Sequence, residues 1–130
     1  MFCKIVNGEA PSFKIWENDG FLAILDKYPR IEGQLLVIKK EHSASGFLEM
    51  DSESAIEFVK LGKFLAGMMK TAIGCFEVTF LIEGLDVKHA HVKLFPVNTY
   101  DEYVEKIGKI GKPASDNDLK IILNKYGKGE

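Results

Sequence analysis

The sequence has 130 residues, of which 46% are hydrophobic and 28% are charged, and its formal net charge is −2. A chain of this length forms one domain with an adequate core, and the composition is that of an ordinary globular protein. There is no basic excess of the kind that sequence-independent binding to duplex nucleic acid needs, although a small anionic ligand requires only a local positive pocket. We therefore expect no nucleic-acid duplex as a partner.

The cysteine content and the hydropathy pattern indicate the cellular compartment in which the protein is expected. Cys3 and Cys75 form no C-x-x-C motif, which is typical of a reducing compartment. No stretch approaches the roughly 20 apolar residues of a membrane span, and the N-terminus carries no apolar run of signal length. The simplest interpretation is a soluble protein of the cytoplasm or the nucleus, with no membrane partner.

Local patterns predict a sheet and one long helix. Residues 52–72 repeat apolar side chains every three or four positions, which predicts a helix that Asp51 or Ser52 caps and Gly74 ends. Alternating or β-branched segments predict five strands, at residues 13–17, 21–26, 33–40, 76–82 and 87–96. The helix falls between the third and fourth strands. This order predicts an α+β fold, an antiparallel meander with the helix packed across it.

The two ends of the chain carry shorter helical patterns. Residues 2–8 predict one helical turn closed at Asn7-Gly8. After Pro96 a short helix begins near Thr99, and a last helix at 119–126 has its apolar residues on one face. We treat residues 1–97 as the core and residues 98–130 as a C-terminal extension of the same domain. The last helix is expected to dock on the sheet, on the long helix or on a second subunit.

The most informative stretch is His89-Ala90-His91-Val92-Lys93-Leu94. Its period of two predicts a strand, with His89, His91 and Lys93 in one row at a spacing of about 6–7 Å. Two imidazoles and an ammonium can meet one phosphate, with one imidazole as the nucleophile and the other groups as donors to the phosphate oxygens. The same spacing also fits polar residues on a wet face or two ligands of a metal site.

This stretch resembles the signature of the histidine-triad (HIT) family, His-φ-His-φ-His-φ-φ, where φ is apolar. Residues 2–12 resemble the family's opening segment, and residues 22–26 resemble its strand with a ribose-binding acid. Residues 33–42 resemble its Gly-His-x-Leu-Val-Ile-Pro-Lys-x-His strand, and residues 84–89 resemble the segment that precedes its histidines. The likeness covers residues 2–97. It implies a homodimer with a continuous ten-stranded sheet and an enzyme, either a hydrolase or a transferase, that acts at a nucleotide α-phosphate.

The resemblance also implies roles. His91 takes the position of the nucleophile, which forms a nucleotidyl-histidine on a phosphoramidate or a dinucleoside polyphosphate of a purine nucleotide, and His89 orients it. Lys93 replaces the third histidine, and a lysine supplies charge but is a poor general acid near neutrality unless its pKa is lowered. Gln34 replaces a histidine and can donate to phosphate without titrating. These departures leave open a catalytically weak or inactive nucleotide-binding or interaction protein.

Other residues are expected to bind the nucleotide. By the resemblance, Asp26 accepts hydrogen bonds from the ribose hydroxyls. Asp86 is expected either to meet the phosphate through its backbone or to hold a lysine. Four apolar residues are expected to form the wall of the base site, although they also fit an ordinary core: Phe2, Ile5, Leu22 and Ile24. Leu25 is expected to contribute to nucleotide binding as well.

Metal binding is the remaining question. Some family members hold a structural zinc with two N-terminal cysteines, a histidine near the position of His42, and one more histidine. Only Cys3 of the cysteine pair is present here, and two ligands do not close a tetrahedral site. We therefore predict no zinc and no other cofactor, with His42 as a surface or loop-anchoring residue. The enzymatic interpretation also requires the His91 ring to face a nucleotide-sized cleft.

Overall fold

The computed structural model describes residues 2–127. Its helices and strands in chain order are α1 (Phe2–Val6), β1 (Lys14–Glu17), β2 (Phe21–Leu25), β3 (Leu35–Lys39), α2 (Ser52–Ile73), β4 (Glu77–Leu81), β5 (His91–Val97), α3 (Tyr100–Lys106) and α4 (Asp116–Lys125). The strands form one five-stranded antiparallel sheet, which confirms the predicted α+β class.

The strand order is β1-β2-β3-β5-β4, so the predicted meander is wrong in one respect: β5 lies between β3 and β4. All residues of β5 from His91 to Val97 are buried, whereas β4 mixes exposed and half-buried positions. A strand that is buried on both faces belongs in the interior of a sheet, and the less apolar strand takes the edge. This placement brings the histidine motif to the middle of the molecule.

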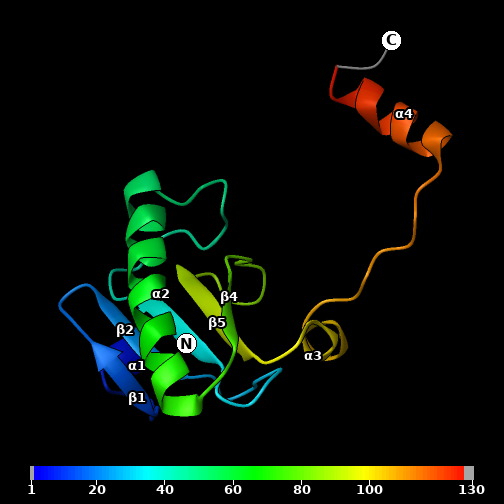
Figure 1. The fold of residues 1–130 in the computed structure, drawn as a ribbon. Coiled ribbons are helices and arrows are strands. Elements are labelled where there is room, and N and C mark those ends of the chain that lie inside the picture. Colours follow the sequence, from blue (N-terminus) through cyan, green and yellow to red (C-terminus); the bar gives the residue numbers. More distant parts are fainter. Residues whose placement is uncertain (1, 128–130) are drawn as a thin grey trace.

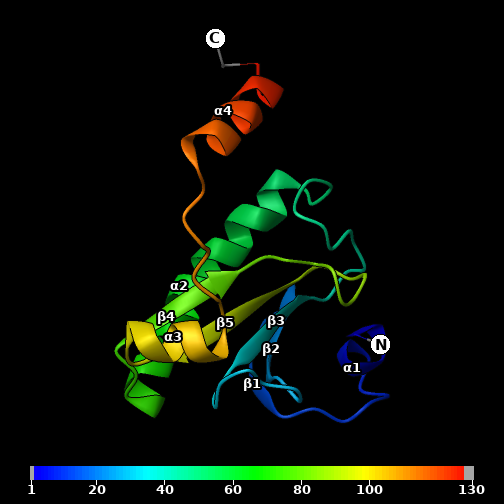
Figure 2. The ribbon, with the colours of Figure 1, turned by 90° about the vertical axis from the view of Figure 1, so that its right-hand side faces the viewer.

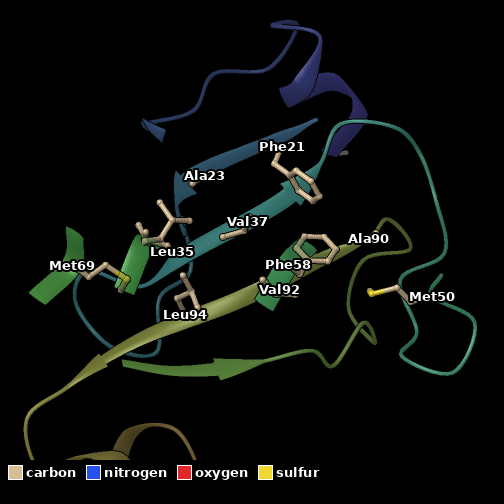
Figure 3. Close-up of a cluster of buried hydrophobic side chains, with 11 residues drawn as sticks. Phe21, Ala23, Leu35, Val37, Met50, Phe58, Met69, Ala90, Val92 and Leu94 are labelled. Carbon is tan, nitrogen blue, oxygen red and sulfur yellow. The ribbon is translucent and has the colours of Figure 1, made fainter. Parts of the chain in front are cut away.

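Helix α2 lies across one face of the sheet (Figure 1). Its buried side chains include Phe58, Leu65 and Met69, which pack with Val37 and Val92 of the sheet in the main core (Figure 3). Full burial of one such side chain contributes about 1.5–3 kcal/mol. The predicted end of the helix is confirmed, because Gly74 takes a left-handed conformation with φ +78°.

The opposite face of the sheet carries the histidine motif. In the β3–β5 register His91 stands opposite Ile38 and Lys93 stands opposite Leu36, so their side chains emerge on the same face. Helix α1 covers part of this face through Phe2, which is 4% exposed. The buried apolar cluster under α1 consists of Phe2, Leu22, Ile24, Leu36 and Ile38. The two faces of the sheet therefore differ: one holds the main core, and the other holds the candidate site.

The C-terminal extension behaves as two separate parts. Helix α3 packs on the sheet, where Tyr103 and Ile107 contact a small cluster that includes Phe95. Residues 109–127 are all exposed, and α4 stands apart from the rest of the chain in both views (Figures 1 and 2). The expected docking of the last helix on the sheet or on α2 is therefore absent in the single chain. The connection holds Gly111 and Pro113 and forms no helix or strand.

Within residues 2–127, no helix is both long enough and apolar enough to cross a membrane.

Candidate functional site

The two histidines do not share a row, because β5 begins at His91 and His89 lies before it. The His89 amide donates to the Val87 carbonyl at 3.0 Å, which closes a tight three-residue turn. The next amide, that of Ala90, donates to the Ser43 carbonyl at 3.1 Å. The predicted strand thus starts too early, and the turn sends the two imidazoles to different neighbours.

The His91 ring is oriented by a backbone carbonyl. Its Nδ1 donates to the His89 carbonyl at 2.7 Å, and since a carbonyl only accepts, the Nδ1 carries a proton. The Nε2 lies 3.2 Å from Oδ1 of Asp86. A hydrogen bond there requires a second proton on the ring, and a doubly protonated imidazole has no lone pair with which to attack.

The His91 ring is enclosed and does not face the open cleft that we expected. It is 1% exposed. The Phe2 ring meets it edge-on with centroids 5.0 Å apart, and Asp86 lies at its Nε2. A nucleotide could therefore reach the Nε2 only after one of these side chains has moved. Phe2 lies against the candidate nucleophile itself.

Lys93 is a buried cation with two carboxylate partners. Its Nζ donates to Oδ2 of Asp86 at 2.7 Å and to Oε1 of Glu83 at 3.2 Å. Burial lowers the pKa of Lys93, but the two carboxylates outweigh it and hold the pKa above its ordinary value. Lys93 is therefore a fixed ammonium and no general acid near neutrality. Glu83 was not anticipated, and the sequence offers only its place just before the histidine motif as a signal.

Asp86 holds Lys93, which is one of the two roles expected for it. Partial burial raises its pKa, but the hydrogen bond and charge of Lys93 outweigh this, and the net pKa falls to about 2. The side chain remains 51% exposed, on the loop between β4 and β5. Asp86 is therefore an ionised carboxylate that reaches into the site from the solvent side.

Asp26 and Gln34 form a pair of their own at the end of β2. The Gln34 Nε2 donates to Oδ2 of Asp26 at 2.6 Å, and its Oε1 accepts from the Arg30 amide at 2.7 Å. Gln34 lies just before β3 and four residues from Ile38, the residue opposite His91, which is about 13 Å along an extended strand. Its amide is engaged in holding Asp26, and the expectation that Gln34 surrounds His91 stays a prediction.

The apolar residues expected at the base site divide between the two faces. Phe2, Leu22 and Ile24 belong to the cluster under α1, with Ile5 packed against it. Leu25 projects to the opposite face, because side chains alternate along β2, and it is 39% exposed. Leu25 is therefore separated from the other four residues.

Cys3, His42 and His89 converge on a second cluster. The Cys3 Sγ lies 3.5 Å from Nδ1 of His42 and 3.4 Å from Nδ1 of His89, and the two Nδ1 atoms are 3.3 Å apart. Zinc bonds of about 2.0–2.1 Å to nitrogen and 2.3 Å to sulfur give tetrahedral edges of roughly 3.3–3.6 Å. The three atoms therefore fit three corners of a zinc tetrahedron.

The hydrogen bonding of the His89 ring also favours metal binding through its Nδ1 atom. Its Nε2 donates to the Lys39 carbonyl at 2.6 Å, so the lone pair of the neutral ring lies on Nδ1, toward Cys3 and His42. Burial, the main cause, lowers the pKa of His89 and favours that neutral form. The expectation that only two ligands are available is wrong. It missed His89, which the strand pattern assigned to the row of His91.

Comparisons with known proteins show the family of this chain. The HIT domain family matches residues 7–99. The chain belongs to the HIT family. An uncharacterised HIT-like protein of Methanocaldococcus jannaschii is 32% identical over 126 residues, 94% of this chain and 97% of that protein. The adenosine 5'-monophosphoramidase HNT1 of Saccharomyces cerevisiae is 34% identical, over 92% of this chain and 73% of that protein.

One of the similar solved structures is that of a zinc-bound protein. The zinc-bound histidine triad family protein of Mycobacterium smegmatis superposes with a TM-score of 0.73 and 25% sequence identity. The alignment covers 99% of this HIT chain and 96% of that one.

Proposed function

We propose that this HIT protein binds a purine nucleotide conjugate and acts at its α-phosphate through a nucleotidyl-histidine on His91. The observation that carries the proposal is the hydrogen bond from Nδ1 of His91 to the His89 carbonyl, at 2.7 Å. It fixes the tautomer and directs Nε2 toward Asp86, whose other carboxylate oxygen holds the Lys93 ammonium, and a phosphate would bind between these two groups. The relationship to an adenosine 5'-monophosphoramidase supports a phosphoramidate as substrate.

The proposed reaction has two steps. The Nε2 lone pair of His91 attacks the α-phosphorus, and the bond from phosphorus to the leaving amine or nucleotide breaks with its electron pair on the leaving group. Water then attacks the phosphorus, and the P–N bond breaks with its electron pair returned to the imidazole. Lys93 holds the phosphoryl oxygens by charge in both steps.

Lys93 also limits the reaction. The leaving group needs a proton, and an ammonium whose pKa is raised by two carboxylates gives one up poorly near neutrality. This observation favours the second candidate function, a nucleotide-binding or interaction protein with weak or no turnover. The enclosed His91 ring favours it as well.

The nucleoside would lie on the face of the sheet under α1. Asp26 would accept from the ribose hydroxyls, and Gln34 would position its carboxylate. The base would lie against Leu22 and Ile24, with Phe2 and Ile5 of α1 beside it. Because this cluster is closed in the free chain, α1 would have to shift when the nucleotide binds.

Turnover and binding assays separate the two candidate functions. Hydrolysis of an adenosine phosphoramidate and of a dinucleoside polyphosphate is measured for the wild type and for His91→Ala, with AMP binding to both by calorimetry. We expect turnover only in the wild type, lowered at least 10²-fold by the substitution. Equal inertness of both proteins, with AMP binding retained, would establish the non-catalytic function instead.

We also propose that Cys3, His42 and His89 hold a zinc ion. When bound, zinc would supply a structural cross-link between α1, the loop after β3 and the turn before β5. A neutral Nδ1 on each histidine and a thiolate on Cys3 would be the ligand atoms. The ion would fix the turn whose carbonyl orients His91.

The partner is proposed to be a second copy of the chain. β4 lies at one edge of the sheet, and α2 exposes apolar side chains such as Ile56 and Val59, at 54% and 46%. Pairing of β4 with a second β4 would give the ten-stranded sheet. Sedimentation equilibrium is expected to give twice the chain mass of 14.6 kDa. The compartment proposed for this dimer is the cytoplasm, with the nucleus as a second location.

A further inference from the structure

The carboxylate of Asp86 has an unusual pair of partners. One oxygen lies 3.2 Å from Nε2 of His91, and the other accepts from Nζ of Lys93 at 2.7 Å. These are the two groups that a substrate phosphoryl would meet in the proposed reaction. A carboxylate and a phosphoryl group are both anionic and both present a pair of oxygen acceptors. The protein therefore already holds an anion of its own between these two groups.

We propose that Asp86 is an internal substitute for the substrate phosphate, which caps the site until an incoming nucleotide displaces it. The inference rests on the proposed function, because it takes His91 and Lys93 as the phosphate-binding groups. It adds a residue that controls access to them. It also accounts for one of the two side chains that enclose the His91 ring, the other being Phe2.

The burial pattern suits displacement. His91 and Lys93 are anchored on β5 and are 1% and 6% exposed. The Asp86 side chain is 51% exposed and belongs to the loop between β4 and β5. It can therefore turn out to solvent without opening the core. In this position its Oδ1 also accepts from the Val87 amide at 2.9 Å.

Displacement leaves Lys93 with a partner and frees the nucleophile. Glu83 remains 3.2 Å from Nζ, so the buried ammonium keeps one carboxylate when Asp86 leaves. The Nε2 of His91 loses its carboxylate neighbour at 3.2 Å, so the position beside this nitrogen becomes accessible to the phosphorus. Binding of the phosphate and exposure of the nucleophile are thus one event.

The cap also sets a requirement for the ligand. A bare phosphate gains only the contacts that Asp86 gives up. A nucleotide also makes contacts through its ribose and base, and the free energy of these contacts offsets the cost of displacing the Asp86 carboxylate. The wild-type site should therefore bind inorganic phosphate poorly and AMP better.

The test compares binding of two probes, inorganic phosphate and AMP, by isothermal titration calorimetry. Asp86→Asn keeps the shape of the side chain and removes its charge, and it is expected to tighten binding of both probes roughly tenfold. Asp19→Asn is the matched control, because Asp19 is an exposed acid in the turn before β2 and its loss changes the net charge equally. The control is expected to stay within about twofold of the wild type.

A double variant tests whether the tighter binding depends on Lys93. If Asp86→Asn exposes Lys93, adding Lys93→Gln should abolish the tighter binding. Asp86→Ser serves as the second single variant, and circular dichroism checks that each protein is folded.

The outcomes are distinct. Equal affinities of the wild type and both Asp86 variants, or an equal gain from Asp19→Asn, would overturn the cap. Absence of phosphate and AMP binding in folded Asp86 variants would overturn it too. Tighter phosphate binding with no preference for AMP would support the cap and count against the proposed nucleotide function.

Discussion

His89 and His91 are only two residues apart, yet they belong to two clusters whose side chains differ in chemistry. Around His91 the partners are charged: Asp86, Lys93 and, through the lysine, Glu83. Around His89 the partners are Cys3 and His42, which bring a sulfur and a nitrogen to within 3.5 Å with no carboxylate between them. In the first cluster the charged side chains pair with one another. In the second cluster the side chains bring together three atoms that can each bind a metal ion.

The difference shows how one side-chain type acquires two roles. In both rings one nitrogen donates to a backbone carbonyl, that of Lys39 for His89 and that of His89 for His91. The bonded nitrogen differs: it is Nε2 in His89 and Nδ1 in His91. Each backbone bond therefore decides which nitrogen remains free and which neighbours that nitrogen meets. The role follows from the tautomer, and the tautomer follows from the turn at residues 87–89.

Removal of one ligand from the metal cluster should have the largest effect. We expect purified protein to contain about one zinc per chain, and Cys3→Ser to lose most of it, since two ligands hold zinc weakly. At free zinc about 100 times above Kd, the lost binding destabilises the fold by about 2.7 kcal/mol, or roughly 10 °C in Tm. Metal analysis and thermal unfolding with and without a chelator measure both effects.

The other cysteine supplies the control for that experiment. Cys75→Ser changes a buried thiol outside the cluster and should leave the zinc content unchanged. Zinc-free wild-type protein that cannot be loaded would show that the three side chains only hydrogen-bond to one another.

A substitution in the charged cluster should give an intermediate effect. Lys93→His replaces a fixed cation by a group that titrates near neutrality and can protonate the leaving group, so turnover should rise several-fold. Lys88→His adds a histidine at a nearby exposed position and should change nothing. Steady-state rates on an adenosine phosphoramidate are measured for the wild type, the Lys93→His variant and the Lys88→His control. An unchanged or lower rate in the Lys93→His protein would mean that the lysine has a role which a histidine cannot fill.

The smallest effect concerns acid stability. The pKa of Asp86 falls from its ordinary value of 3.8 to about 2 in the folded chain. A lowered folded pKa means that the carboxylate stabilises the fold above about pH 4, and this contribution is lost as the pH falls toward 2. Since the side chain is half exposed, the loss should stay below about 1 kcal/mol.

Urea unfolding at several pH values between 6 and 2 measures this loss. Asp86→Asn should be less stable than the wild type at pH 6, with a gap that closes toward pH 2. A gap that is independent of pH would show that the ion pair with Lys93 contributes nothing to stability.

Much of the fold could be predicted from local patterns. The spacing of apolar residues in α2, the glycine that ends it and the β-branched strands are short-range signals, and each strand and helix appears near its expected place. Side-chain alternation would also have separated Leu25 from Leu22 and Ile24, because it depends only on the period of a strand. The family signature gave His91 its place on β5.

The rest depends on contacts that no local pattern contains. Cys3 meets His89 across 86 residues and His42 across 39, and β5 enters the sheet between strands that come before it. The pairing of Lys93 with Asp86 and Glu83 spans a loop whose path the sequence does not indicate. The sequence by itself determined the elements and the family, and it led to the proposal that His91 is the reactive imidazole. Tertiary structure alone decided which neighbours each imidazole has, because hydrogen bonds and ion pairs depend on distance in space and not on distance along the chain.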